Sequence, residues 1–457
     1  MNLAQAFRMD SMPRLALVGA GGKTTALFQL ARLIPLPVFV TTTTHMGTWQ
    51  VELADMHIRI HDINDLPDLL DETLEGVILI TGDVVREDRI SGLSLEVVDQ
   101  LRSIADQRKL PLLIEADGSR QKPLKAPAEY EPVIPAFVSL VIVVAGLSGL
   151  GKPINAQWVH RAGDFVELSG SCDGEIITPG VLANVLLHPE GGLKGIPPGA
   201  RRVVLLNQVD TIDLHRSADE LAARLLSAYQ AVIVSSLHPP DAALSPTVYE
   251  THERVAGIVL AAGGGRRFAQ SGRDTPKQLL IWEGMPLVRH VTLCALQVGL
   301  SPVVLVTGAN EPDVLAAISD LPVKIVHNPV WESGQSSSLQ AGLNILPVGV
   351  GSAVFLLADQ PQVTPDLVSL LVKRHSQTLA PMVAPLVEGK RANPILFDRV
   401  TFPTLLSLSG DVGGRALFTS NSKYSVDWVP WDDPDLLMDV DTEFDYQVLL
   451  GRKVHKP

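Results

Sequence analysis

The sequence has few cysteines, few aromatic residues and no long apolar run. Its two cysteines, Cys172 and Cys294, lie far apart and form no CxxC pair. This argues against a disulfide framework and a zinc ribbon, and for a reducing cytoplasm. No segment reaches the roughly 18 uninterrupted apolar residues that a membrane helix needs. The first residues carry no basic region followed by an apolar run, so we expect no secretory signal and a cytoplasmic protein.

Clusters of basic residues are also missing. The formal net charge is −13, and no run of lysine and arginine is long enough to form a nucleic-acid-binding face. We therefore expect neither nucleic acid nor a membrane as a partner. A small nucleotide substrate needs only a few local cations at a glycine loop, so the acidic total does not oppose it.

The chain has 457 residues, which favours two to three domains. Two segments open alike, with a short apolar strand, a run of glycines with a basic residue, and then a helical pattern. The glycine runs are Gly19–Lys23 and Ala261–Arg267. The segment Ser236–Glu253 is rich in His, Pro and Ser, so we interpret it as a linker. We predict two domains, 1–253 and 254–457.

Apolar strands recur between amphipathic stretches in both halves. Continuous Val, Ile and Leu runs separated by helices favour mainly parallel sheets that are covered on both faces. The fold class is therefore predicted to be α/β in both domains. Examples of these runs are Val38–Thr41, Val77–Thr81, Leu140–Ala145, Val203–Leu206, Val303–Thr307 and Ala353–Ala358.

The glycines of the second half suit a triphosphate, because backbone N–H groups can approach phosphates where no side chain intervenes. Arg266, Arg267 and Lys277 can neutralise charge on the phosphates and on the departing pyrophosphate. Taken alone, a glycine-rich turn is equally compatible with a tight turn of no functional importance.

Carboxylates follow further along the second half. Asp359 comes directly after an apolar strand, at the edge of a parallel sheet where such folds bind ligands. An aspartate there can hold Mg²⁺ that bridges nucleotide phosphates. Asp439 and Asp441 lie on one face of an extended segment and can complete the shell of that ion. The alternative is that Asp359 and Asp441 are helix N-caps.

Several ordered motifs of the second half resemble the MobA-like nucleotidyltransferases, and most of all molybdenum cofactor cytidylyltransferase. The motifs are Leu260–Phe268, Pro276–Leu280, Asn328–Leu339, Asp359–Pro361, Gly389–Phe397, Gly410–Arg415 and Asp439–Thr442. The resemblance implies a Rossmann-like (GT-A-like) fold. It also implies that CMP passes from CTP to the phosphate of a molybdopterin cofactor, with release of pyrophosphate.

The resemblance also assigns residues. It implies that Arg266, Arg267, Lys277 and Asp359 are catalytic, that Asn393 and Pro394 lie on the acceptor side, and that Asp359, Asp441 and Asp439 bind Mg²⁺. The nucleotide would contact Leu260, Ala261, Ala262, Gly263, Gly264, Gly265, Ser336 and Ser337. The stretch Ala269–Thr275 is longer than the family usually has at this point.

The first half opens with the Gly-Lys-Thr end of a P-loop, in which Lys23 would reach the β- and γ-phosphates and Thr24 the metal. The usual first glycine of that motif is replaced by Leu17, so the loop is shortened. Glu115 and Asp117 follow an apolar strand and suit a metal. Asn207 and Asp210 have the spacing of an Asn-x-x-Asp pair that reads guanine, and the alternative is a polar turn before the next helix. The predicted nucleotide-binding residues of this half are Gly19, Gly21, Gly22, Lys23, Thr24, Asn207 and Asp210.

Motifs across nearly the whole first half resemble the YqeC-like accessory proteins of selenium-dependent molybdenum hydroxylases. They include Thr41–His45, Gly82–Val85, Ile114–Arg120, Pro123–Pro127, Gly151–Pro153, His188–Gly192 and Asn207–Asp210. The resemblance implies a P-loop-NTPase-like three-layer domain that serves hydroxylase maturation. His45, His160 and His188 are candidate ligands, although a lone histidine is more often structural.

The leading hypothesis is a cytidylyltransferase fused to a nucleotide-binding maturation domain, with CTP, a molybdopterin cofactor and a molybdenum hydroxylase as partners. One alternative is transfer to another phosphorylated acceptor or from GTP. The other is a carrier or insertion chaperone that binds the nucleotide and the hydroxylase without catalysing transfer.

Overall fold

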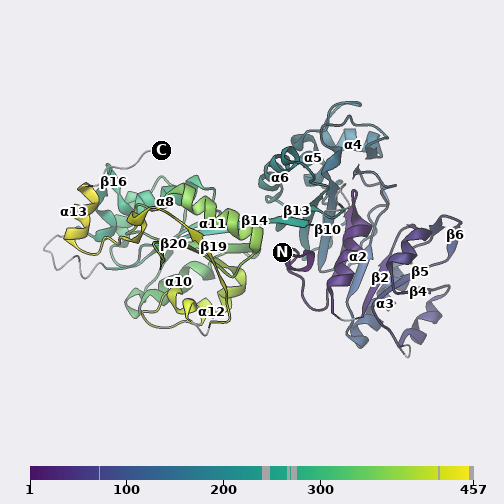
Figure 1. The fold of residues 1–457 in the computed structure, drawn as a ribbon, viewed down its shortest axis with the longest axis horizontal. Helices are drawn as coiled ribbons and strands as arrows, with labels where there is room; N and C mark the ends of the chain where they lie inside the picture. Colours follow the sequence, from purple (N-terminus) through teal and green to yellow (C-terminus); the bar gives the residue numbers. More distant parts are fainter. Residues whose placement is uncertain are drawn as a thin grey trace. The chain divides into compact units, whose positions relative to one another are not determined.

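The computed structural model of the protein describes residues 1–35, 37–70, 73–238, 247–264, 268, 275–419 and 422–451. The chain divides into two compact units, Met1–His252 and Glu253–Pro457. Both units contain parallel strands with helices packed on them, which confirms the α/β fold class (Figure 1). Among the described residues, none of the helices combines the length and the hydropathy that crossing a lipid bilayer requires.

The first unit is built on a sheet of parallel strands. Its strand β1 (Arg14–Gly19) lies between β8 (Leu112–Glu115) and β10 (Leu140–Gly146). The order continues with β2, β5 and β4 beyond β8, and with β12 and β13 beyond β10. These outer strands span Val38–Thr42, Val77–Thr81, Met56–Arg59, Arg201–Asn207 and Ala231–Ser236. Because the strands are parallel, their carboxyl ends meet at one edge of the sheet.

Helices cover both faces of this sheet. Alternate residues of β1 enter two different cores, since Leu15 and Leu17 pack on one face and Ala16 and Val18 on the other. The first core contains residues of α1 (Leu3–Ala6) and α2 (Lys23–Leu33). The second contains residues of α3 (Leu95–Arg108), α4 (Ala162–Ser169), α5 (Pro179–Leu187) and α6 (Ile212–Leu225). The first unit therefore has three layers.

Short strands complete the first unit. The strands β3 (Met46–Gly47), β6 (Val84–Arg86) and β7 (Arg89–Ile90) form a small sheet, and β9 (Leu124–Lys125) pairs with β11 (Val159–His160). Among the described residues, the 3₁₀ helices are η1 (Thr48–Leu53), η2 (Ile63–Leu70) and η3 (Leu147–Gly149) in the first unit, and η4 (Lys277–Leu279), η5 (Trp331–Ser333), η6 (Arg399–Thr401), η7 (Gly414–Phe418) and η8 (Pro434–Leu437) in the second.

The second unit has a mixed sheet. The strand β14 (Thr247–Leu260) begins in the first unit and ends in the second, where it pairs in parallel with β17 (Val303–Thr307) and β19 (Val350–Leu357). On one side β18 (Lys324–His327) follows β17, and on the other β22, β20 and β23 follow β19. These last strands span Ile395–Asp398, Met382–Val387 and Val426–Pro430. The sequence predicted a mainly parallel sheet, and β22 is antiparallel to both of its neighbours.

The second unit also has a core on each face of its sheet. Val259 packs with residues of α8 (Leu287–Gln297) and α11 (Pro365–Thr378). Ile258 packs with residues of α10 (Gln335–Asn344) and α12 (Phe402–Leu406). The other elements in the described part of this unit include α9 (Glu311–Ala317), α13 (Glu443–Gly451), β15 (Ile281–Trp282), β16 (Met285–Pro286) and β21 (Lys390–Arg391). The glycine loop after β14 and Asp359 after β19 thus emerge from neighbouring parallel strands.

Candidate active sites

The glycine loop of the second unit is closely packed. Directly after β14, Ala261 and Ala262 are buried, and the Gln278 amide donates hydrogen bonds to the carbonyl oxygens of Ala261, at 3.2 Å, and Gly263. A Cβ atom on Gly264 would lie 2.9 Å from the ring of Trp331. The loop therefore requires small residues where an indole covers it. Gly265, Arg266 and Arg267 lie outside the described residues, and their role with the triphosphate stays a prediction.

A cavity of about 480 Å³ opens beside this loop. Six of the residues singled out by sequence line it, namely Leu260, Ala262, Gly263, Gly264, Lys277 and Asp359. They come from the carboxyl ends of β14 and β19 and from η4, so the fold brings together residues that are about 100 positions apart. A cavity of this size at the carboxyl edge of parallel strands suits a small ligand.

Lys277 is the buried cation of this cavity. Its Nζ atom lies 2.6 Å from Asp359 Oδ2 and 2.6 Å from Asp441 Oδ1. Burial alone would lower the pKa of Lys277, but the charges and hydrogen bonds of the two carboxylates outweigh it and raise that pKa above its usual value. Lys277 therefore remains protonated at physiological pH, as a ligand for phosphate oxygens must be.

Asp359 offers one buried oxygen to a divalent cation, although the ligand oxygens of Asp359, Asp439 and Asp441 do not all lie within 4.8 Å of one another in the described residues. The Oδ1 atom of Asp359 is buried and has no hydrogen-bond partner in the described part of the chain, although its Oδ2 atom contacts Lys277. A buried carboxylate oxygen without a partner is costly, and a hard cation would satisfy it. Asp441 reaches the same lysine, and Asp439 accepts a hydrogen bond from Gln360, the neighbour of Asp359. The assignment of these three aspartates to Mg²⁺ stays a prediction.

The two predicted serines at the start of α10 face inward. Ser336 Oγ donates a hydrogen bond to Gly410 O at 2.7 Å, and Ser337 Oγ donates one to Gly334 O at 2.9 Å. Ser338, the third serine of this run, lines the cavity together with Gln335. The predicted contact of Ser336 and Ser337 with the nucleotide stays untested.

The two predicted acceptor residues lie elsewhere in the second unit. Asn393 and Pro394 follow β21 and precede β22, and neither lines the 480 Å³ cavity. Their role on the acceptor side stays a prediction.

Sequence reasoning overlooked several residues that line the cavity. Gln278 holds the glycine loop, Trp331 covers it, and Gln335 and Asp411 also line the cavity. Trp331 and Gln335 lie in the Asn328–Leu339 motif, so the signal was present in the sequence. Which side chains of that motif face the cavity depends on the path of η5 and α10.

The glycine loop of the first unit follows β1. Gly19, Gly21 and Gly22 have positive φ angles of 96°, 86° and 127°, a conformation that favours glycine. A Cβ atom on Gly21 would lie 2.4 Å from Gly146 N of β10, so the loop also leaves no room for a side chain there. Lys23 begins α2 and donates a hydrogen bond to Gly19 O at 2.7 Å. The shortened loop is thus compact and closes on its own lysine.

Acidic residues at the end of β8 contact this loop. Glu115 accepts a hydrogen bond from Thr24 Oγ1 at 2.8 Å, and Asp117 accepts one from Gly19 N at 3.0 Å. Lys23 Nζ lies 3.2 Å from Asp117. Burial raises the pKa of Glu115 above its usual value. Sequence reasoning expected these acids near a metal at the loop, and the structure places both beside Lys23 and Thr24.

Asn207 supports the glycine loop from β12. It is only 2% exposed, and its side-chain amide donates a hydrogen bond to Gly21 O at 2.8 Å. Its Oδ1 atom accepts one from Leu237 N at 3.0 Å. Asp210 accepts a hydrogen bond from Ser236 Oγ at 2.5 Å. The polar atoms of Asn207 are thus used inside the protein, and guanine reading by Asn207 and Asp210 stays a prediction.

A cavity of about 760 Å³ in the first unit contains Gly21, Gly22, Lys23 and Thr24 among its lining residues. Of the three candidate histidines, His45 and His160 line it and His188 does not. The ring of His188 instead accepts a hydrogen bond from Glu190 N at 3.0 Å, a structural role.

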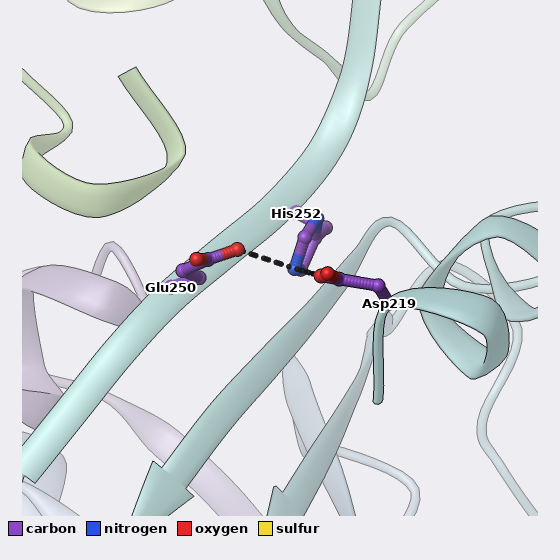
Figure 2. A group of neighbouring side chains, drawn as sticks. All are labelled: Asp219, Glu250 and His252. Carbon is purple, nitrogen blue, oxygen red and sulfur yellow. Dashed lines mark ion pairs between the residues drawn. The ribbon is translucent and has the colours of Figure 1, made fainter. Parts of the chain in front are cut away.

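A separate group of ionisable side chains joins α6 to β14 in the first unit. Figure 2 shows Asp219, Glu250 and His252 turned toward one another. His252 Nε2 lies 3.1 Å from Glu250 Oε2 and 3.5 Å from Asp219 Oδ1. In the described ranges of the chain, it is the one group of at least three ligand-type residues whose ligand atoms all lie within 4.8 Å of one another. Ion pairing accounts for this geometry, and no cation is assigned here.

The fold of the second unit and the residues around its cavity define the class of protein to which this unit belongs. The second unit, with its glycine loop, buried lysine and carboxylates around one cavity, is a nucleotidyltransferase domain. By sequence the chain belongs to two families. Residues 15–163 match the YqeC protein family, and residues 257–425 match the MobA-like NTP transferase domain.

Known proteins resemble each half separately. The chain is 35% identical over 201 residues to the uncharacterized protein YqeC of Escherichia coli, which covers 42% of this chain and 75% of that protein. It is 33% identical over 195 residues to nicotine blue oxidoreductase of Paenarthrobacter nicotinovorans, and the match covers 41% of this chain and 92% of that protein. The crystal structure of Rv0371c from Mycobacterium tuberculosis in complex with manganese is 28% identical in sequence. The match covers 44% of this chain and 100% of that one, with a TM-score of 0.38.

Proposed function

We propose that the second unit transfers CMP from CTP to the phosphate of a Mo-molybdopterin cofactor and releases pyrophosphate, with Mg²⁺ as its metal. The observation that supports this most strongly is the placement of Lys277 between Asp359 and Asp441 at the cavity beside the glycine loop. A MobA-like domain and an acceptor with a terminal phosphate are both consistent with that arrangement. The choice of CTP rests on the resemblance of the Ala261-Ala262 pair to the corresponding residues of cytidine-transferring members of the family.

The chain supplies position and charge rather than a nucleophile. An oxygen of the acceptor phosphate attacks the α-phosphorus of CTP, and the bond to the departing pyrophosphate breaks. Backbone N–H groups of the glycine loop and the ammonium of Lys277 would hold the triphosphate and neutralise charge on the leaving group. Asp359, Asp441 and Asp439 would hold Mg²⁺, which supplies additional positive charge to the phosphates.

The test is a direct assay of the full chain. Purified protein is incubated with Mg²⁺, Mo-molybdopterin and either CTP or GTP, and the dinucleotide cofactor and pyrophosphate are measured. We expect product with CTP and none with GTP. The Asp359→Ala protein should form no product, whereas Asp320→Asn, which changes an exposed aspartate paired with Arg289, should act as the wild type.

The other outcomes distinguish the alternatives. Product with GTP alone would change the base assignment. No product with an intact acceptor, together with tight binding of that acceptor, would favour a carrier or insertion chaperone. Unchanged transfer in the Asp359→Ala protein would contradict the metal assignment.

A second candidate activity comes from one relative. Nicotine blue oxidoreductase shares 33% of its residues with this chain over 92% of its own length. We therefore include nicotine blue as a parallel substrate and follow its absorbance. Bleaching of the dye that survives Asp359→Ala would favour an oxidoreductase over a transferase.

For the first unit we propose binding of a nucleoside triphosphate at the glycine loop, in support of the maturation of a molybdenum hydroxylase. The positive-φ glycines and the contacts of Lys23 and Thr24 with Asp117 and Glu115 support this. Calorimetric titration with ATP, GTP and CTP tests it. Lys23→Ala should abolish the binding, whereas Lys109→Ala, at the end of α3 and away from the cavity, should not.

A further inference from the structure

The 760 Å³ cavity of the first unit carries more positive charge than its glycine loop accounts for. Besides Lys23, four other cations line it, namely Arg89, Arg120, Lys122 and Arg161. The carboxylates that line it are only Asp88, Glu115 and Glu131. The excess is notable in a chain whose formal net charge is −13.

Three of these cations lie near a carboxylate. Lys23 Nζ is 3.8 Å from Glu115, and Arg161 Nη1 is 2.7 Å from Glu131. Arg89 Nε is 4.0 Å from its neighbour Asp88.

The other two cations have no acidic partner. In the part of the chain that the structure describes, the Arg120 side chain forms no hydrogen bond or ion pair, and Lys122 Nζ donates only to Gln157 O, at 3.0 Å. An anionic ligand in this cavity would supply the missing negative charge.

The backbone presents these side chains in a constrained way. Arg120 and Gln121 have φ angles of +48° and +59°, and Arg161 has +61°. Residues with a side chain rarely adopt this left-handed region, and such conformations cluster at functional sites. Arg161 is also held by Glu131 and by the ring of Tyr130, whose centroid is 5.9 Å from its guanidinium carbon. Its position is therefore fixed before any ligand arrives.

The pKa of His160 reflects the positive charge of the same cavity. His160 is half-buried in the cavity lining, next to Arg161 in sequence. Burial, together with the positive charges of Arg161, Lys125 and Arg120, lowers the pKa of His160 to about 4. The ring is neutral at physiological pH, so it adds no charge of its own and can accept or donate a hydrogen bond.

We propose that Arg120, Lys122 and Arg161 form a binding site for a phosphate-bearing small molecule, distinct from any nucleotide at the glycine loop. The guanidinium of Arg120 offers paired N–H donors that match phosphate oxygens, Lys122 adds a point charge, and Arg161 adds a guanidinium that Glu131 already holds in place. A phosphorylated metabolite in the same cavity as a glycine loop would make the first unit a two-substrate site rather than a simple nucleotide-binding module. The inference does not depend on cytidylyl transfer by the second unit.

The experiment is calorimetric titration of the full chain with inorganic phosphate in a chloride buffer. The wild type and Lys23→Ala should both bind phosphate. Arg120→Gln and Lys122→Gln should each weaken binding about ten-fold, because each removes a charge-assisted contact. Arg120→Lys should lose less phosphate affinity than Arg120→Gln, because it keeps a positive charge at this position. The control Arg216→Gln, an exposed arginine of α6, should bind as the wild type does.

A second readout is independent of affinity. The ring resonances of His160, assigned with a His160→Gln protein, should shift on addition of phosphate at pH 7, and the shift should disappear in Arg120→Gln. CTP-dependent transfer by the second unit should be unchanged in Arg120→Gln, so failure of either proposal is recognisable separately.

Three outcomes would overturn the proposal. The first is a wild-type protein that does not bind phosphate. The second is a Lys23→Ala protein that loses all phosphate binding while Arg120→Gln and Lys122→Gln keep it, which would place the anion at the glycine loop alone. The third is equal affinity for succinate, which would identify a carboxylate site instead.

Discussion

Lys277 Nζ lies 2.6 Å from Asp441 Oδ1, although 164 residues separate the two in the sequence. The same ammonium lies 2.6 Å from Asp359. One buried lysine thus contacts both the residue that follows β19 and the segment that precedes α13. We expect a bound triphosphate to give this lysine new oxygen partners and to leave the two carboxylates for a cation.

Replacement of Lys277 should impair transfer strongly. Lys277→Met removes the cation that would neutralise the leaving group, and loss of one such contact costs about two orders of magnitude in kcat. The steady-state rate of pyrophosphate release from CTP measures this. Lys373→Met, on the exposed surface of α11, should leave the rate within about two-fold of the wild type. A Lys277→Met enzyme with an unchanged kcat would show that the lysine is structural.

The first unit should lose stability in acid through Glu131. Burial alone would raise the pKa of Glu131, but hydrogen bonds and charges from Arg161 and Lys125 outweigh it and hold that pKa at about 2. A carboxyl with a depressed folded-state pKa stabilises the protein above its unfolded pKa, near 4.5, and loses this contribution as the pH falls toward 2.

Urea unfolding between pH 6 and pH 3 measures this linkage. The wild type should lose about 2 kcal/mol through this one group between pH 6 and pH 3. Glu131→Gln should be less stable at pH 6 but should show a shallower decline with acid. A decline of equal slope in both proteins would contradict the assigned pKa.

Local signals in the sequence predicted much of this architecture. Continuous apolar runs predicted the strands, because a parallel strand is buried on both faces, and the position of Asp359 after such a run predicted its place at the cavity. The contact of Gly264 with Trp331 and that of Lys277 with Asp441 could not be predicted by the same means. Both join segments that are distant in the sequence, and only the strand order decides which loops meet.

Gly334 should tolerate no side chain. Its φ of +115° is unfavourable for other residues, and a Cβ atom would lie 2.4–2.5 Å from backbone atoms of Gly410 and Asp411. Gly334→Ala should therefore destabilise the second unit by about 2–4 kcal/mol. The matched control is Gly389→Ala, which has a φ of +75° but open space around it and should cost only about 1 kcal/mol.

Thermal or urea unfolding of both proteins, fitted with separate transitions for the two units, gives these values. Equal costs for the two substitutions would show that the Gly410–Asp411 segment moves aside, and that the start of α10 is not pinned by it.

A substitution at Asn207 distinguishes support of the glycine loop from reading of the nucleotide base. The Asn207 side chain hydrogen-bonds to Gly21 O and Leu237 N while buried, so Asn207→Ala leaves both backbone groups without that partner. We expect a loss of about 2–3 kcal/mol in the stability of the first unit and weaker binding of every nucleoside triphosphate alike. Asn64→Ala, at an exposed position, should change neither. If Asn207 instead reads a base, the variant will keep its stability and lose only the preference for one base. Measuring urea stability and the Kd values for GTP and ATP on the same preparation separates the two roles.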